Sequence, residues 1–303
     1  MALLAVDIGG TKIAQALVTQ AGEIGLRSEQ PTDHAGPQAV IAQIAAFAAG
    51  HRLDAAAVSI PAVLEPGTDR VLWAPNLPGW RDTPLRELLR ERLGCPVFVE
   101  YDGHAAALGE WWAGAAKGCS SVVSVIIGTG IGGGVIVENR LWRGRDRLAG
   151  AVGWLPMAGA DGLDHWENLA AGPGIAHQAR RLIRQGAAST LAADTLTARD
   201  VFAAARAGDR LAAQVVSEAA ALIGQGVSGL ISFVNPHIVV LGGSVGQQGD
   251  LLLPGVYAAV NRWTQPVSGR AIPIVSSTLG ADANLLGAAY TAFSTLTSGD
   301  TNT

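Results

Sequence analysis

A carboxylate, two glycines and a threonine follow an apolar run near the start of the chain, where residues 5–12 read Ala-Val-Asp-Ile-Gly-Gly-Thr-Lys. The pattern predicts a buried strand near 2–8 and a turn into a second strand near 13–19. Glycines let the backbone approach a bulky anion, and N–H groups in such a turn can bind phosphate oxygens. Asp7 could then hold hydrated Mg²⁺ at the mouth of the turn. The same residues also suit an ordinary hairpin, so this stretch alone leaves both interpretations open.

Two more glycine-rich turns follow predicted strands further along the chain. Residues 128–134 read Gly-Thr-Gly-Ile-Gly-Gly-Gly after an apolar run, and Gly242-Gly243-Ser244 follows the run 236–241. Three strands that end in glycine turns suit a nucleotide laid across two sub-domains. Their spacing is neither Gly-x-Gly-x-x-Gly before a helix nor Gly-x4-Gly-Lys-Ser/Thr, which disfavours a dinucleotide-type Rossmann site and a P-loop.

Asp102 is the residue best suited to acid–base chemistry. It follows a predicted strand at 96–101 and precedes a predicted helix at 103–115. In open α/β sheets ligands bind beyond the carboxyl ends of strands, and phosphoryl transfer to a hydroxyl needs a nearby proton acceptor. The alternative is an N-cap, in which Asp102 accepts a hydrogen bond from the Ala105 N–H.

Composition and patterning predict a soluble α/β protein. The 303 residues are 49% hydrophobic and carry a net charge of -4, which gives no reason to expect nucleic acid as a partner. Neither a secretion signal nor a membrane span is expected, and we predict a cytoplasmic location. Cys95 and Cys119 are isolated, so they indicate neither a disulfide framework nor a zinc site. Two similar β-β-β-α units predict a duplicated architecture with a cleft between the halves.

Several motifs together resemble the ROK family of sugar kinases, and they span nearly the whole chain in the family's order. They are Asp7-Ile-Gly-Gly-Thr-Lys12, Pro75-Asn-Leu-Pro-Gly-Trp80, Glu100-Tyr-Asp-Gly-His-Ala-Ala-Ala-Leu-Gly-Glu110, Gly128–Gly134, Glu167 with Ala171-Gly172, Leu241-Gly-Gly-Ser244 and Asp282-Ala-Asn-Leu-Leu-Gly-Ala-Ala289.

The resemblance implies an actin-like/hexokinase-like (ribonuclease H-like) duplicated ATPase fold whose two lobes close over ATP and a hexose. We place the N-terminal lobe at 1–117 with a closing helix at 283–297, and the C-terminal lobe at 118–282. By the same resemblance the chain forms a homodimer, and the apolar helix 211–233 serves either that interface or the core.

The resemblance also assigns roles to residues. Asp102 takes the proton from the sugar hydroxyl, usually O6, and Asp7 holds Mg²⁺ through water. Mg-ATP is held by Asp7, Gly9, Gly10, Thr11, Lys12, Gly128, Thr129, Gly130, Gly132, Gly242 and Gly243. The sugar is bound by Asn76, Tyr101, Asp102, Trp154 and Glu167; Asn76 and Glu167 have the alternative role of fixing loops.

Four departures from the family pattern surround the expected sugar site. Tyr101 and His104 replace asparagines, Ala151 to Trp154 replaces Glu-x-Gly-His, and no cysteine follows Met157 up to Trp166. Structural zinc in this family needs three thiolates and an imidazole, so we predict no zinc and a shortened 158–165 loop held by packing. Trp154 either stacks on a sugar face or fills the pocket.

The leading hypothesis is therefore an ATP- and Mg²⁺-dependent kinase whose sugar is atypical for the family. A second hypothesis is a non-catalytic sugar or nucleotide sensor, motivated by Ala151 and Trp154. A sugar-responsive repressor is disfavoured, because the phosphate motif begins at residue 7 without a preceding helix-turn-helix domain. The sequence does not tell which sugar is used or whether another phosphoryl donor replaces ATP.

Overall fold

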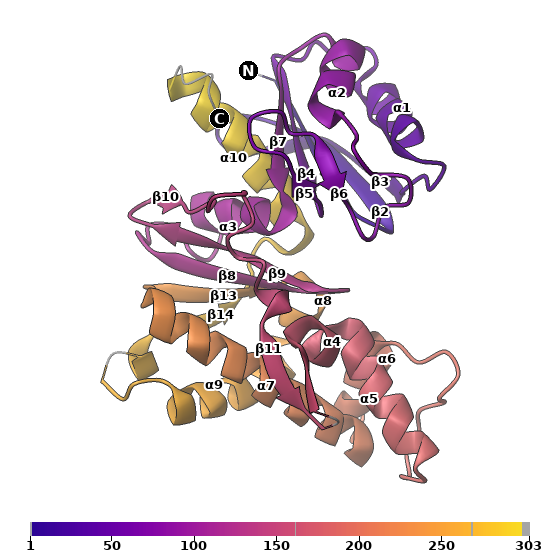
Figure 1. The fold of residues 1–303 in the computed structure, drawn as a ribbon, viewed down its shortest axis with the longest axis vertical. Coiled ribbons are helices and arrows are strands. Elements are labelled where there is room, and N and C mark those ends of the chain that lie inside the picture. Colours follow the sequence, from indigo (N-terminus) through magenta and orange to yellow (C-terminus); the bar gives the residue numbers. More distant parts are fainter. Residues whose placement is uncertain (1, 161, 268, 299–303) are drawn as a thin grey trace.

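Two five-stranded sheets of matching topology form the frame of the computed structural model, which describes residues 2–160, 162–267 and 269–298 (Figure 1). The first sheet has the order β3-β2-β1-β4-β7, with β1 Leu3–Ile8, β2 Lys12–Val18, β3 Ile24–Pro31, β4 Ala55–Ile60 and β7 Val97–Tyr101. The second has the order β10-β9-β8-β13-β14, with β8 Val122–Ile127, β9 Ile131–Val137, β10 Arg140–Leu141, β13 Ile238–Gly242 and β14 Ile274–Ser276.

In each sheet three consecutive strands pair antiparallel, and two later strands extend the sheet in parallel beside the first. Two small hairpins stand outside these sheets: β5 Val63–Leu64 with β6 Val71–Trp73, and β11 Pro156–Gly159 with β12 Gly162–His165. The repeated order confirms the duplicated α/β architecture that the sequence predicted. The predicted lobe ranges include residues 1, 161 and 268, which lie outside the described residues.

The helices are α1 Pro37–Ala48, α2 Leu85–Leu93, α3 Asp102–Trp112, α4 Trp166–Ala170, α5 Gly172–Arg184, α6 Ala198–Arg206, α7 Arg210–Val234, α8 Gly243–Gly246, α9 Gly249–Trp263 and α10 Ala283–Ser298. Because β1 is buried on both faces, its alternating side chains enter two cores: Leu4 packs with the α1 and α2 side chains, and Leu3 packs with α10. In the other half, α4 to α7 and α9 cover one face of the second sheet.

Helix α3 lies between the two sheets and packs against both α10 and β9 (Figure 1). The approach of α3 to α10 depends on glycine, because a Cβ at Gly287 would overlap the Ala105 carbonyl oxygen. A Cβ at Gly103 would likewise overlap the Gly133 carbonyl of β9. These close contacts fix the start of α3, and therefore Asp102, relative to both halves of the chain.

A break at Ala171 separates α4 from α5. Ala171 is extended (ψ 170°), and α5 restarts at Gly172 with Pro173 in its first turn. The Gly172 N–H donates instead to the Gly128 carbonyl oxygen at 2.8 Å, so the break ties this segment to the second glycine loop.

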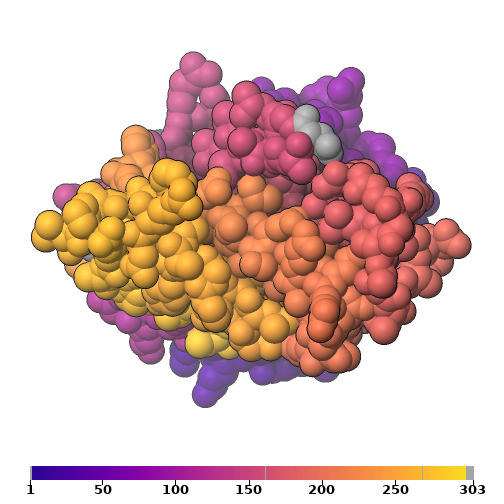
Figure 2. Space-filling view, turned by 90° about the horizontal axis from the view of Figure 1, so that it is seen from below, coloured from indigo at the N-terminus to yellow at the C-terminus, as the bar shows by residue number. Residues whose placement is uncertain are grey.

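Helix α7 has 25 residues and is long and apolar enough to cross a membrane, but 61% of its most apolar stretch is buried within the protein. Its buried residues include Val215, Ala219 and Ile223, which belong to the core of the second half. Burial therefore explains its apolar composition. Figure 2 shows the outer face of this half, formed by the later segments of the chain.

Candidate active site

Asp102 is the first residue of α3, directly after the last residue of β7. Its Oδ1 accepts a hydrogen bond of 2.8 Å from the Gly103 N–H. Tyr101, not Asp102, occupies the N-cap position, so the predicted alternative of an Asp102 bond to the Ala105 N–H is wrong. Burial, together with the nearby negative charge of Asp7, raises the pKa of Asp102 to about 7. A carboxyl group with such a pKa can accept a proton near neutral pH.

Asp7 lies one residue before the end of β1, between Ala14 of β2 and Ser59 of β4. Its Oδ1 accepts a hydrogen bond of 2.9 Å from Asn284 Nδ2 of α10. Burial raises the pKa of Asp7, although the Asn284 hydrogen bond and the Lys12 charge oppose the rise. Sequence reasoning gave Asn284 no role, although it had included Asp282-Ala-Asn among its motifs.

Asp7, Lys12, Gly242 and Gly243 line one cavity of about 150 Å³ together with Asn284. The structure thus brings the first and third predicted glycine turns together across the two halves. Gly243 has φ 76° where α8 begins, a left-handed conformation that favours glycine. The same cavity is lined by Ser277, whose hydroxyl donates to the buried Glu110 carboxylate of α3.

The first two glycine turns are closed by short backbone hydrogen bonds. The Gly9 N–H donates to the Lys12 carbonyl oxygen, and the Gly128 N–H donates to the Gly130 carbonyl oxygen, both at 2.9 Å. A Cβ at Gly10 would lie 2.9 Å from the Asn76 carbonyl oxygen, which places Asn76 directly against the first turn. Thr11 and Thr129 are exposed at these turns.

Tyr101 and Glu167 lie near Asp102 and the second glycine turn. Glu167 Oε2 accepts from the Ile131 N–H at 3.3 Å, and a Cβ at Gly130 would lie 2.8 Å from that oxygen. A Cβ at Gly132 would lie 2.8 Å from the Tyr101 hydroxyl. Burial raises the pKa of Tyr101 above its ordinary value, and the charges of Asp102 and Glu167 add to the rise. The phenol therefore lies close to both carboxylates.

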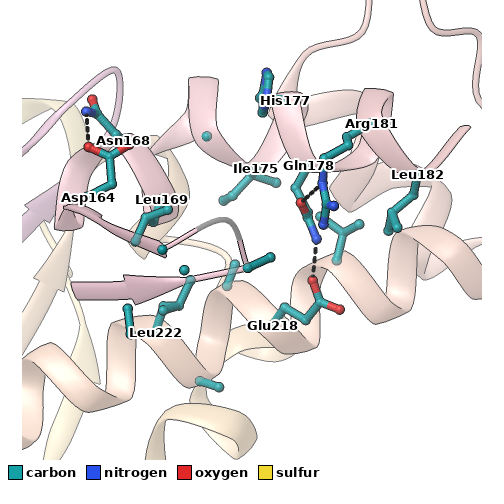
Figure 3. A pocket seen from close by; sticks show the side chains of 18 of the residues that line it. Asp164, Asn168, Leu169, Ile175, His177, Gln178, Arg181, Leu182, Glu218 and Leu222 are labelled. Atoms are coloured by element: carbon teal, nitrogen blue, oxygen red, sulfur yellow. Dashed lines mark hydrogen bonds between the residues drawn. The ribbon is translucent and has the colours of Figure 1, made fainter. Parts of the chain in front are cut away.

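The larger cavity, about 520 Å³, lies elsewhere in the C-terminal half, between the β11–β12 hairpin, α5 and α7 (Figure 3). Its polar lining is internally bonded: Gln178 Nε2 donates to Glu218 Oε2 at 2.8 Å, and Arg181 Nε donates to Gln178 Oε1 at 2.9 Å. None of the residues predicted to bind ATP or sugar lines it.

The family model described as "ROK family" matches residues 3–294. The chain belongs to the ROK family. It is 33% identical to a glucokinase of Halalkalibacterium halodurans, in a match that covers 94% of this chain and 93% of that one. Its fold is similar to that of a ROK family glucokinase from Streptomyces griseus in complex with glucose and AMPPNP, with a TM-score of 0.83, 30% identity, and 96% and 99% of the two chains covered. A ROK hexokinase from Thermus thermophilus gives a TM-score of 0.80 at 32% identity, with 99% and 100% covered. These neighbours confirm the hexokinase-like fold.

Trp154 of this ROK family chain does not fill a pocket. Its side chain is 53% exposed, and its ring packs edge-on against His165 of β12 with centroids 4.9 Å apart. The predicted interpretation of Trp154 as a pocket filler is therefore wrong. The segment expected as a loop forms the β11–β12 hairpin, and residue 161 lies outside the described residues.

Proposed function

We propose that this chain transfers the γ-phosphoryl group of ATP to a hydroxyl group of a hexose or amino sugar, usually O6, with Asp102 as the base. The observation that supports this most is the half-buried Asp102 carboxyl, whose pKa of about 7 suits proton transfer at the start of α3, near Asp7 and the second glycine turn. The glucokinase relatives support a sugar kinase that uses ATP.

Each group in the proposed reaction has one task. The Asp102 carboxylate accepts the hydroxyl proton while the sugar oxygen forms a bond to the γ-phosphorus and the bond to ADP breaks. The phosphates are held by Gly9, Gly10, Thr11 and Lys12, by Gly128, Thr129, Gly130 and Gly132, and by Gly242 and Gly243. Backbone N–H groups in glycine turns suit this, because they bring partial positive charge close to phosphate oxygens.

Asp7 is the residue that we propose for Mg²⁺, through water. The fit rests on a half-buried carboxylate whose pKa is raised by loss of solvent, since a cation would compensate a charge that is costly without one. The Asn284 amide donates to the Oδ1 atom of Asp7, not to Oδ2, among the described contacts. When bound, Mg²⁺ would neutralise the phosphate charge that develops during transfer.

Sugar binding is proposed for Asn76, Tyr101, Asp102, Glu167 and Trp154. Tyr101 brings a phenol ring close to Asp102 and Glu167, where the family pattern has the smaller asparagine. The Ala151 side chain supplies no hydrogen-bonding group, and Trp154 faces His165. The side chains around the proposed sugar site differ from the family pattern, whereas Asp102 and the glycine turns are intact. This combination favours a working kinase with an atypical sugar over a non-catalytic sensor.

We also propose that the chain holds no structural zinc. Within the described residues no group of three or more His, Cys, Asp and Glu side chains could hold a metal ion. Elemental analysis of the purified protein is expected to give less zinc than one atom per chain. Stoichiometric zinc that survives dialysis against a chelator would contradict this proposal.

Membership of the family also suggests a location, an oligomeric state and lobe boundaries for this chain. We propose a cytoplasmic homodimer whose N-terminal lobe comprises 1–117 with the closing helix 283–297 and whose C-terminal lobe comprises 118–282. The packing of α10 on β1, β4 and α3 supports the inclusion of the closing helix in the first lobe.

Activity is expected to require pH near or above neutral. Because the folded pKa of Asp102 is raised to about 7, the base is protonated and inactive below that pH. A coupled ADP-release assay over a panel of hexoses, amino sugars and polyols should find turnover with at least one of them. For that sugar, kcat/KM should fall as pH drops below about 7. Nucleotide binding without turnover on any sugar would contradict the kinase proposal, and a profile that stays flat down to the ordinary carboxyl range would contradict Asp102 as the base.

A further inference from the structure

A buried ionic cluster joins a loop of the second half of the chain to the first half beside Asp102. The loop, residues 142–151, connects β10 to a short 3-10 helix at Val152–Trp154. We call the cluster the latch. Its members from the first half are Asp69, Glu100 and His104, and its members from the loop are Arg143, Arg147 and the Ala149 carbonyl group.

Glu100 is the centre of the latch, with only 1% of its side chain exposed. Its Oε2 accepts from Arg143 Nε at 3.1 Å and Nη2 at 2.7 Å, and its Oε1 accepts from Arg147 Nη2 at 3.4 Å. Although burial alone raises the pKa of Glu100, the His104 hydrogen bond and the two arginine charges hold it well below its usual range. Glu100 is therefore a charged, fully compensated acid in the interior.

Arg147 connects Glu100 to Asp69. Its Nη1 donates to the Asp69 carboxylate, and its Nη2 also donates to the Val99 carbonyl oxygen of β7 at 2.8 Å. Asp69 precedes β6, has 4% of its side chain exposed, and has a second cation in Arg86 at 3.2 Å. One guanidinium from the second half thus binds two buried groups of β7 and the turn before β6.

The backbone of Arg147 adds an independent sign that the residue is held in place. Its φ is 56°, in the left-handed region that favours glycine and is strained for a long side chain. Such a conformation persists when surrounding contacts over-determine it. Here those contacts are the bonds to Asp69, Glu100 and Val99.

His104 closes the latch from α3. Its side chain is fully buried, its Nε2 donates to the Ala149 carbonyl oxygen at 2.7 Å, and its Nδ1 lies 3.2 Å from Glu100 Oε1. Glu100 and His104 each stand two residues from Asp102. Ala149 leads into Gly150, where a Cβ would overlap the Gly133 carbonyl of β9.

We propose that Arg147 and Asp69 are positioning residues, which hold the 142–151 loop on the first half. They thereby set the distance between Asp102 and the segment after the loop, which carries Trp154 and Glu167 of the proposed sugar site. This inference rests on the proposed sugar kinase function. The latch keeps the sugar subsite formed before the sugar binds, so its loss weakens sugar use and leaves ATP binding intact.

The test compares two arginines of the same loop. Arg147→Gly removes the guanidinium at a backbone position that suits glycine, and Glu100 and Asp69 keep Arg143, His104 and Arg86 as partners. Arg145→Met is the matched control, because Arg145 is 91% exposed and pairs only with Asp146 among the described residues. Both variants are assayed with the best sugar of the panel, varying sugar and ATP separately.

We expect Arg147→Gly to raise the KM for sugar about tenfold while the KM for ATP stays unchanged. Mere loss of folded protein would lower kcat and leave both KM values unchanged, and that result overturns the inference. Adding Asp69→Asn to Arg147→Gly should change the sugar KM little further, since the partner that Asp69 has on the loop is already lost. Arg145→Met should match the wild type.

Amide hydrogen exchange gives a second readout that needs no turnover. Without substrates, amides of 143–151 should exchange faster in Arg147→Gly than in the wild type and in Arg145→Met. The inference is overturned if the 143–151 amides of Arg147→Gly exchange at the wild-type rate, or if the active variant keeps the wild-type KM for sugar. A wild-type protein that phosphorylates no sugar overturns the proposed function instead, and the exchange result still decides whether the latch holds the loop.

Discussion

Asp102→Asn is expected to lower kcat for sugar phosphorylation by about 10²–10⁴-fold while ATP and sugar still bind. An amide has nearly the same size and can still accept from the Gly103 N–H, which lies 2.8 Å from Oδ1. It cannot take the hydroxyl proton. Initial rates from ADP release give kcat, and calorimetric titration gives the affinity for each ligand.

The control for this variant is Asp146→Asn, the same chemical change at an exposed carboxylate that pairs with Arg145 at 2.8 Å. Asp146→Asn should retain wild-type kcat. If Asp102→Asn kept a kcat close to that of the wild type, Asp102 would not be the base.

Stability should move in the direction opposite to activity. Burial raises the folded-state pKa of Asp102 to about 7, above the value of 3.8 for an unperturbed aspartate. Between pH 3.8 and about 7 the native state therefore keeps a proton that the unfolded state has lost. The contribution of this group to stability is lost as pH rises through about 7. Above that pH the wild type carries an unfavourable buried charge, which Asp102→Asn removes. The melting temperature of the Asp102→Asn variant at pH 8 should be at least that of the wild type.

The parts of the site that were predictable from the sequence are local ones. A glycine turn after an apolar strand requires its residue types within a few positions, so the turns at Gly9, Gly128 and Gly242 could be recognised one by one. The place of Asp102 between β7 and α3 follows from the same reasoning. The repeated strand order was also predictable, because both halves repeat the same sequence of strand and helix patterns.

The parts that escaped prediction depend on contacts between distant segments. Asn284 reaches Asp7 across 277 positions, and Arg147 reaches Asp69 across 78. Nothing in the types or spacing of these residues marks them as partners, since arginine and asparagine are common on surfaces. The outward position of Trp154 likewise follows from its packing on His165 of the β11–β12 hairpin.

Asp7→Asn is expected to lower kcat by about 10²-fold and to raise the Mg²⁺ concentration needed for half-maximal activity. Asparagine keeps an oxygen that can accept from Asn284 Nδ2, now 2.9 Å from Asp7 Oδ1, so the contact between β1 and α10 is preserved. Only the charge that would attract the cation is lost. Rates measured over a Mg²⁺ series at saturating ATP test this, with Glu23→Gln on an exposed turn as the control.

The same variant also tests the electrostatic coupling between the two aspartates. The Asp7 charge raises the pKa of Asp102, so its removal should lower that pKa and shift the acid limb of kcat/KM to lower pH. Asp102→Asn removes the limb, whereas Asp7→Asn moves it. A Mg²⁺ dependence equal to that of Glu23→Gln would contradict the metal assignment, and an unmoved acid limb would contradict the coupling. The two aspartates would then act independently, although the Asp7 charge lies near Asp102.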